Sequence, residues 1–149
     1  MDAPEGAFAE EFRKAQEALR SGNYPTALCC LQRCVAWCPT PECLSALGYC
    51  QAKVQGDFEG GVARCQEALS LEPDNSFHHL QLGRIHLLAD RRSEAIMVWR
   101  QGLRLEKNRH IIRELERLGV RRDPVLPFLH RQHLVNVVLG KCMTRLGLR

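Results

Sequence analysis

The residues best suited to chemistry in this sequence are its 8 cysteines and 6 histidines. Cys30, Cys34 and Cys38 recur every four positions, which places them on one face of a helix. Thiolates bind zinc well, and Cys43 follows as a fourth candidate ligand. However, the stretch from Cys30 to Cys38 extends roughly 12 Å along a helix, too far for all its sulfurs to lie about 2.3 Å from one ion. We therefore predict that these cysteines are small apolar core residues and that the protein binds no metal.

The histidines and acids form no recognisable catalytic group. His130 and His133 lie three positions apart, but two ligands leave an ion under-coordinated. His78 and His79 open a predicted helix, where we expect them to contact solvent. The sequence contains no glycine-rich phosphate loop, nucleophile elbow or zinc-protease helix motif. We predict no catalytic residues, no enzymatic activity, no cofactor and no small-molecule substrate.

Composition is that of an ordinary globular protein, with 45% hydrophobic and 26% charged residues in 149. No apolar run approaches the roughly 18–20 residues that cross a bilayer, and no secretory signal is visible. We therefore expect a cytoplasmic protein whose cysteines stay reduced. Residues 109–149 hold 9 Lys and Arg against 3 Asp and Glu, whereas the rest of the chain holds 12 against 14. The basic charge is thus concentrated in the C-terminal part.

The elements that position these residues follow an internal repeat of 34 positions. Ala27, Gly61 and Ala95 are separated by this step and are all small. The same step relates other columns of similar residues: Gly22 and Gly56; Leu31, Cys65 and Trp99; Cys34, Ala68 and Gly102; Trp37, Leu71 and Leu105; Pro39 and Pro73. A fixed period of this length indicates stacked structural repeats. The third unit departs from the pattern, because it lacks the turn glycine and the closing proline.

The period and its small and aromatic positions resemble the tetratricopeptide repeat, a helix–turn–helix unit. Leu82-Gly83 is similar to the family's Leu-Gly pair, and Gly56-Asp57-Phe58 is similar to the turn between its helices. Ala27-Leu28 matches the small-apolar pair of its second helix. The resemblance covers roughly residues 8–107 and implies an all-α fold, a right-handed helical-hairpin solenoid of three repeats. We expect one domain, 1–149, with repeats at about 8–41, 42–75 and 76–109 and C-terminal capping helices in 110–149.

Amphipathic spacing independently predicts helices. Ala27, Leu31 and Cys34 lie on one helical stripe, and Leu31 and Trp99 are expected in the core. Gly22 and Gly56 are expected to end helices in the left-handed conformation. The predicted helices lie near 6–21, 24–37, 41–55, 58–71, 75–89, 92–105, 108–118 and 131–146.

In this family the concave face, lined by the first helix of each repeat, binds partners. The matching positions form a predicted peptide-binding groove: Phe12, Gln16, Arg20, Cys50, Lys53, Phe77, Leu80, Arg84 and Leu87. Ile111 and Glu114 extend it. Large apolar side chains with a few cations suit an amphipathic helix or an extended segment that carries an acid. Some family members clamp the carboxylate tail of heat-shock chaperones with lysines, an arginine and asparagines. Here those positions hold Phe12, Gln16, Leu47, Phe77 and Gln81, so we do not predict chaperone-tail binding.

The sequence thus favours a non-catalytic scaffold that binds a protein or peptide. One alternative is a small cytosolic chaperone for secreted proteins, which the repeat number also fits. Another is a basic C-terminal surface that binds RNA or an anionic membrane, although nucleic acid is the less favoured partner. A homo-oligomer stays open, as does the choice between a C-terminal segment that caps the solenoid and one that fills its groove.

Overall fold

The structure, a computed structural model, describes residues 6–119, 138–139 and 141–143. The chain divides into two compact units, Met1–Glu114 and Leu115–Arg149, and the first contains most of the described residues. The predicted helix near 131–146 lies outside the described residues except at 138–139 and 141–143, which are helical. No strand occurs in the part of the chain that the structure describes.

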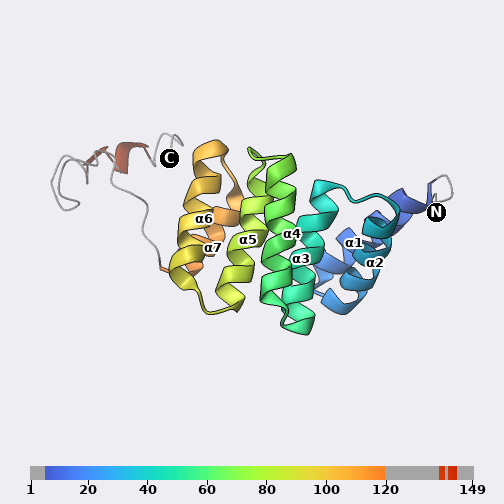
Figure 1. The fold of residues 1–149 in the computed structure, drawn as a ribbon. Coiled ribbons are helices and arrows are strands. Elements are labelled where there is room, and N and C mark those ends of the chain that lie inside the picture. The colour runs from blue at the N-terminus through green and yellow to red at the C-terminus, as the bar shows by residue number, and fades with distance from the viewer. Residues whose placement is uncertain (1–5, 120–137, 140, 144–149) are drawn as a thin grey trace. The chain divides into compact units, whose positions relative to one another are not determined.

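The described chain forms three helical hairpins followed by a seventh helix, as Figure 1 shows. The bounds are α1 Ala7–Ser21, α2 Tyr24–Trp37, α3 Pro41–Gln55, α4 Phe58–Leu71, α5 Ser76–Leu88, α6 Arg92–Leu105 and α7 Arg109–Arg117. Each agrees closely with a helix predicted from the sequence. None of the helices in the described ranges combines the length and the apolar character needed to span a bilayer.

The turns within the hairpins explain where the helices end. Gly22 and Gly56 adopt the left-handed conformation, with φ of 75° and 72°, and this confirms their predicted role. In the third hairpin, Asp90 takes a positive φ of 58° in place of glycine. The Asn23 and Asp57 side chains then accept hydrogen bonds from the backbone N–H groups of Thr26 and Gly60, which caps α2 and α4. The third unit thus retains the turn without the glycine that the repeat otherwise uses.

Small residues let the paired helices approach closely. Ala27 and Ala95 are fully buried. In the middle hairpin, a Cβ added to Gly48 would lie only 2.6 Å from the Gly61 carbonyl oxygen. A Cβ added to Gly61 would in turn lie 2.7 Å from the Gly48 carbonyl oxygen. The backbones of α3 and α4 are therefore in direct contact, which accounts for glycine at position 61 where the repeat usually has alanine.

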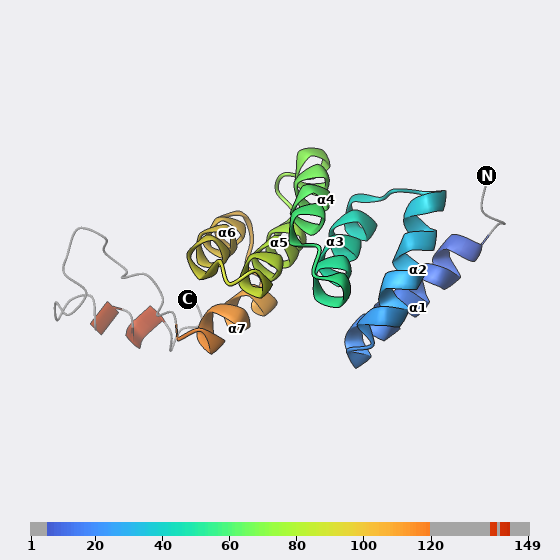
Figure 2. The same cartoon turned by 60° about the horizontal axis from the view of Figure 1, so that its bottom comes forward.

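The first helices of the second and third hairpins are each enclosed by several neighbours within the first unit. Helix α3 packs against α2, α4 and α5, and α5 packs against α3, α4 and α6 (Figures 1 and 2). Leu31 and Trp99 are fully buried, which confirms them as core residues. The prediction that His78 and His79 contact solvent is wrong, because they are only 0% and 3% exposed. Amphipathic spacing did not reveal that α5 is covered on several sides.

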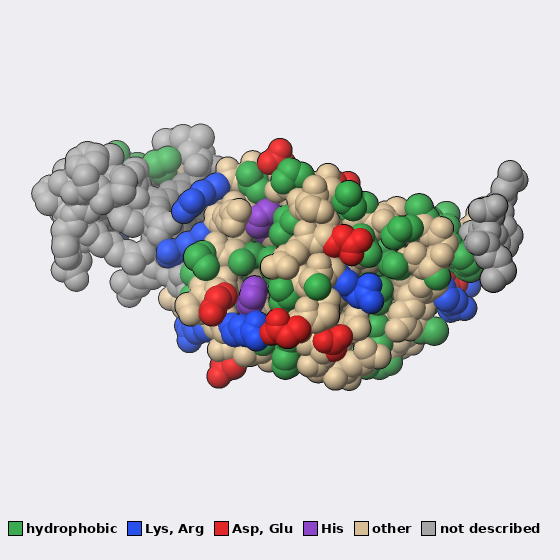
Figure 3. Space-filling model, in the orientation of Figure 1, with side chains coloured by type: hydrophobic (Ala, Val, Ile, Leu, Met, Phe, Trp, Pro, Cys, Tyr) green, Lys and Arg blue, Asp and Glu red, His purple; other side chains and the backbone are tan. Residues whose placement is uncertain are grey.

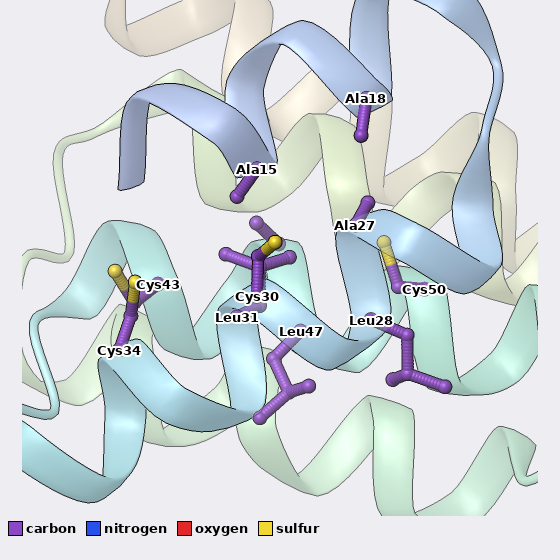
Figure 4. Packing of buried hydrophobic residues seen from close by; sticks show 11 residues of the cluster. Ala15, Ala18, Ala27, Leu28, Cys30, Leu31, Cys34, Cys43, Leu47 and Cys50 are labelled. Atoms are coloured by element: carbon purple, nitrogen blue, oxygen red, sulfur yellow. The ribbon is translucent and has the colours of Figure 1, made fainter. Parts of the chain in front are cut away.

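Five cysteines belong to the core, and Figure 4 shows several of them between α1, α2 and α3. The buried cysteines are Cys30, Cys34, Cys43, Cys50 and Cys65. Their burial confirms the predicted apolar role for Cys30 and Cys34. Cys43 is confirmed in the same role, but the prediction is wrong for Cys38, which follows the last residue of α2 and is exposed, as are Cys29 and Cys142.

Candidate functional site

The predicted groove residues lie on α1, α3 and α5, but they differ in accessibility. Gln16, Arg20 and Lys53 are exposed. Phe12, Phe77, Arg84 and Leu87 are partly buried. We call the surface formed by these seven residues the first-helix face.

Two residues of the predicted groove, Cys50 and Leu80, are core residues instead, and so is Ile111, which was predicted to extend the groove but is 0% exposed. Cys50 is 0% exposed and packs in the cluster that contains Ala27 and Leu31. Leu80 is 3% exposed, and its carbonyl oxygen accepts a hydrogen bond from the Trp99 indole N–H at 3.1 Å. Both side chains point into the packing between helices, so neither offers surface to a ligand. The remainder of the groove stays a prediction.

A row of aromatic and charged side chains crosses this face from the first hairpin to α7. The rings of Tyr24 and Tyr49 meet edge to face, with their centroids 5.7 Å apart. The Lys53 ammonium lies 5.8 Å from the centre of the Tyr24 ring, and the Arg84 guanidinium lies 5.5 Å from that of Tyr49. These are cation–π distances. We call Tyr24, Tyr49, Lys53, Arg84 and Glu114 the tyrosine–cation row.

Arg84 ends this row with an ion pair to Glu114. Its Nε donates to Glu114 Oε1 at 2.8 Å, and a terminal guanidinium nitrogen lies 2.8 Å from the same oxygen. The two side chains are 27% and 12% exposed, so the pair is partly shielded from water. The sequence placed Arg84 in the groove as a contact for a partner's carboxylate. In the structure a carboxylate of this chain already occupies that position.

Tyr49 contributes a neutral hydrogen-bonding group to the row. Burial raises the pKa of Tyr49, and a hydrogen bond with Tyr24 raises it further. The phenol therefore keeps its proton at neutral pH, and the charges of the row are those of Lys53, Arg84 and Glu114. The groove predicted from the sequence includes neither Tyr24 nor Tyr49. Tyr49 could have been selected from the sequence, because it is an aromatic residue that directly follows Leu47-Gly48 on a predicted first helix.

Partly buried phenylalanines supply apolar surface on and beside the first-helix face. Phe8 and Phe12 stack with their ring centroids 6.0 Å apart. Phe12 and Phe77 both pack, partly buried, against the core cluster formed by α1, α2 and α3. Because these rings are not fully covered, they leave apolar surface beside polar groups such as Gln16.

A line of polar side chains that joins α3 to α5 resembles a catalytic arrangement but lacks access for a substrate. Ser45 Oγ lies 2.9 Å from His78 Nδ1, and His78 Nε2 lies 3.1 Å from Glu72 Oε2. Ser45 and His78 are both 0% exposed, so no substrate reaches the hydroxyl. The line joins α3 to α5 and satisfies polar groups that would be costly to bury unpaired.

The charges of the described surface are mixed in sign. Figure 3 shows Asp and Glu interspersed with Lys and Arg and with apolar side chains on the face in view. Within the described residues, no three His, Cys, Asp or Glu side chains come together in a way that could hold a metal ion.

Comparison with known proteins identifies the fold. No family model and no curated protein matches this sequence. Among solved structures, the chain is 18% identical to the Sgt2 TPR domain from Aspergillus fumigatus, with a TM-score of 0.63 over 79% of this chain and 79% of that domain. It is 20% identical to the second TPR domain of human RPAP3, solved in complex with an HSP70 peptide, with a TM-score of 0.61 over 80% of this chain and 100% of that domain.

An enzyme structure contains a similar region. The chain is 21% identical to an O-GlcNAc transferase mutant of Thermobaculum terrenum, with a TM-score of 0.63 over 74% of this chain. It spans only 21% of the length of that transferase. These likenesses agree with the helical hairpins described above. The chain therefore has the fold of a tetratricopeptide-repeat domain.

Proposed function

We propose that this protein is a non-catalytic scaffold that binds a peptide or helical segment of a partner protein on its first-helix face. The observation that carries the proposal is the tyrosine–cation row, which presents rings and charges from successive hairpins along one surface. The RPAP3 domain was solved with an HSP70 peptide, and the TPR2B domain of yeast Sti1, which has a similar fold, was solved as a complex with pHsp70; both support a role in protein binding. Half-exposed aromatic rings next to cations are also typical of protein interfaces.

The chemistry of the face favours a segment with apolar side chains and at least one acid. Phe12 and Phe77 supply partly buried rings, and Lys53 supplies an exposed cation. Arg84 is held by Glu114, so a partner's carboxylate has to compete with that residue. Lys53 is thus the more accessible of the two cations for a charge-assisted hydrogen bond.

A peptide library panned on the purified protein tests this proposal. We expect enriched peptides to combine apolar residues with Asp or Glu. Lys53→Ala and Gln16→Ala change exposed side chains, so they should leave the fold intact. We expect each to weaken binding of an enriched peptide, measured by fluorescence anisotropy, and Lys53→Ala to have the larger effect because it removes a charge.

Glu67→Ala is the matched control, since Glu67 is exposed on the second helix of the middle hairpin. It should bind the selected peptide like the unmodified protein. If Phe77→Ala and Lys53→Ala together leave the affinity unchanged in a folded protein, the first-helix face is not the binding surface. If panning enriches no peptide, the proposed function fails.

RNA binding is a second candidate function, favoured by the exposed cations where α6 ends and α7 begins. Arg104, Lys107, Arg109 and Arg113 are all exposed there. Phosphate contacts of this kind give an affinity that falls steeply with salt. We expect Arg104→Glu with Arg109→Glu to abolish any binding of single-stranded RNA, and absence of binding at low salt would dismiss this candidate.

A further inference from the structure

Two thiols meet where the first hairpin joins the second. Cys34 lies near the end of α2 and Cys43 lies in the first turn of α3. Both are 0% exposed, and each thiol is close enough to the other to shift its pKa. Figure 4 shows the two sulfur atoms side by side, whereas the Cys30 and Cys50 side chains point elsewhere.

The connection between the helices keeps these sulfurs together. Helix α2 ends at Trp37 and α3 begins at Pro41, so only residues 38–40 separate them. Thr40 caps α3, because its hydroxyl oxygen accepts a hydrogen bond from the Cys43 backbone N–H at 3.3 Å. A short capped connection of this kind limits the independent movement of the two helix ends.

The two cysteines differ in their electrostatic surroundings. Cys43 lies at a helix N-terminus, where the partial positive charge favours a thiolate, while Cys34 lies near a helix C-terminus, which disfavours one. Burial raises the pKa of both thiols, that of Cys34 to about 12. For Cys43, hydrogen bonds from Thr40 and Cys34 act in the opposite direction. Cys43 is therefore the better nucleophile of the pair.

We propose that Cys34 and Cys43 form a disulfide by exchange with a low-molecular-weight disulfide such as oxidised glutathione, and that this bond fastens α2 to α3. The Cys43 thiolate attacks one sulfur of the small disulfide, and the first small thiolate leaves. Cys34 then loses its proton and attacks the Cys43 sulfur of the mixed disulfide, which releases the second small thiolate. Two protein thiols are oxidised, one small disulfide is reduced to two thiols, and the two protons go to the leaving groups.

Burial makes this exchange depend on opening of the junction between α2 and α3. A small disulfide reaches neither sulfur while the helices are packed, so the reaction should be slow in the native protein. It should accelerate in urea concentrations too low to unfold the chain. Once formed, the bond restricts the unfolded chain and should raise thermal stability.

The test uses the full chain with the exposed Cys29, Cys38 and Cys142 changed to Ser, which leaves the 5 buried cysteines. The protein is incubated with oxidised glutathione in low urea, and its disulfides are mapped by mass spectrometry. We expect one cross-link, Cys34–Cys43, and a thermal midpoint raised by on the order of 5–10 °C. Reductant should break the cross-link and return the thermal midpoint to its original value. Cys34→Ala should prevent both the cross-link and the rise in the midpoint. Cys65→Ala, which removes a buried cysteine of α4, should retain the cross-link.

Three results would overturn the proposal. One is a protein that keeps all its buried thiols under these conditions. Another is a cross-link that joins Cys30 to Cys34 or Cys43 instead. The third is a midpoint that falls on formation of the expected bond. The mapping uses the unchanged pair, so it decides the question even if Cys34→Ala does not fold.

Discussion

At the scale of single residues, Gly83 shows how closely a side chain of one helix fills the space beside another. A Cβ added to Gly83 would lie well inside van der Waals contact with the pyrrole part of the Trp99 ring. The indole N–H of that ring also donates to the Leu80 carbonyl oxygen. This position on α5 is therefore closed to any side chain.

We predict that Gly83→Ala destabilises the protein by about 1–3 kcal/mol. The substitution improves helix propensity by only about 1 kcal/mol, which does not offset the displacement of Trp99 and its hydrogen bond. Urea denaturation measures the difference. The double variant with Trp99→Phe is the control, because a smaller ring makes room for the methyl group. If the effects of Gly83→Ala and Trp99→Phe on the free energy of unfolding are additive, contact with the Trp99 ring is not what excludes a side chain at position 83.

At the scale of elements, the caps of the second helices can be tested separately from packing. We predict that Asp57→Ala lowers the free energy of unfolding by about 1 kcal/mol, because the Gly60 N–H at the start of α4 loses its acceptor. Urea denaturation again gives the value. Glu59→Ala removes a neighbouring acid that pairs with Arg91 at the surface, and should cost less than about 0.5 kcal/mol. If Asp57→Ala and Glu59→Ala lower the free energy of unfolding equally, loss of negative charge, rather than loss of the cap, explains the effect.

Helix α5 should make stability depend on pH. Burial lowers the pKa of His79 and of His86 from its ordinary value. Below about pH 6.5 the unfolded chain then binds protons that the folded chain does not. We therefore predict full stability above that pH and a progressive loss as pH falls toward 5, measured by urea denaturation at a series of pH values.

Replacing both histidines by Gln should flatten that pH profile, whatever the effect on stability at pH 7. The pKa values of Glu72 and Glu94 are also lowered, but these groups affect stability in a separate pH range, below about pH 4.5. A profile that keeps its slope between pH 7 and 5 in the double variant would show that other groups are responsible.

The helices themselves could be predicted from the sequence because spacing, turn glycines and the 34-residue step all act locally. The candidate site was only partly predictable. The resemblance to the tetratricopeptide repeat suggested the face that carries Phe12 and Arg84, but it did not show that neighbouring helices cover Cys50 and Leu80. It also could not reveal the ion pair with Glu114, because that contact depends on how α7 packs beside α5.

At the scale of the whole molecule, the predicted role of the C-terminal segment as a cap can be tested by truncation after Gly119. Repeat stacks need a cover on their last apolar face. We predict that the truncated protein keeps a helix-dominated circular dichroism spectrum, since the hairpins lie upstream, but melts at a lower temperature. An unchanged melting temperature would rule out the capping role.

The ion pair between Arg84 and Glu114 has a consequence for the thermodynamics of partner binding. A ligand carboxylate that takes the place of Glu114 exchanges one ion pair for another, so little net charge is neutralised at Arg84. A ligand acid that meets Lys53 forms an additional pair. We expect binding through Lys53 to weaken with rising ionic strength and binding through Arg84 to be nearly indifferent to it, so that salt alone distinguishes the two ends of the row.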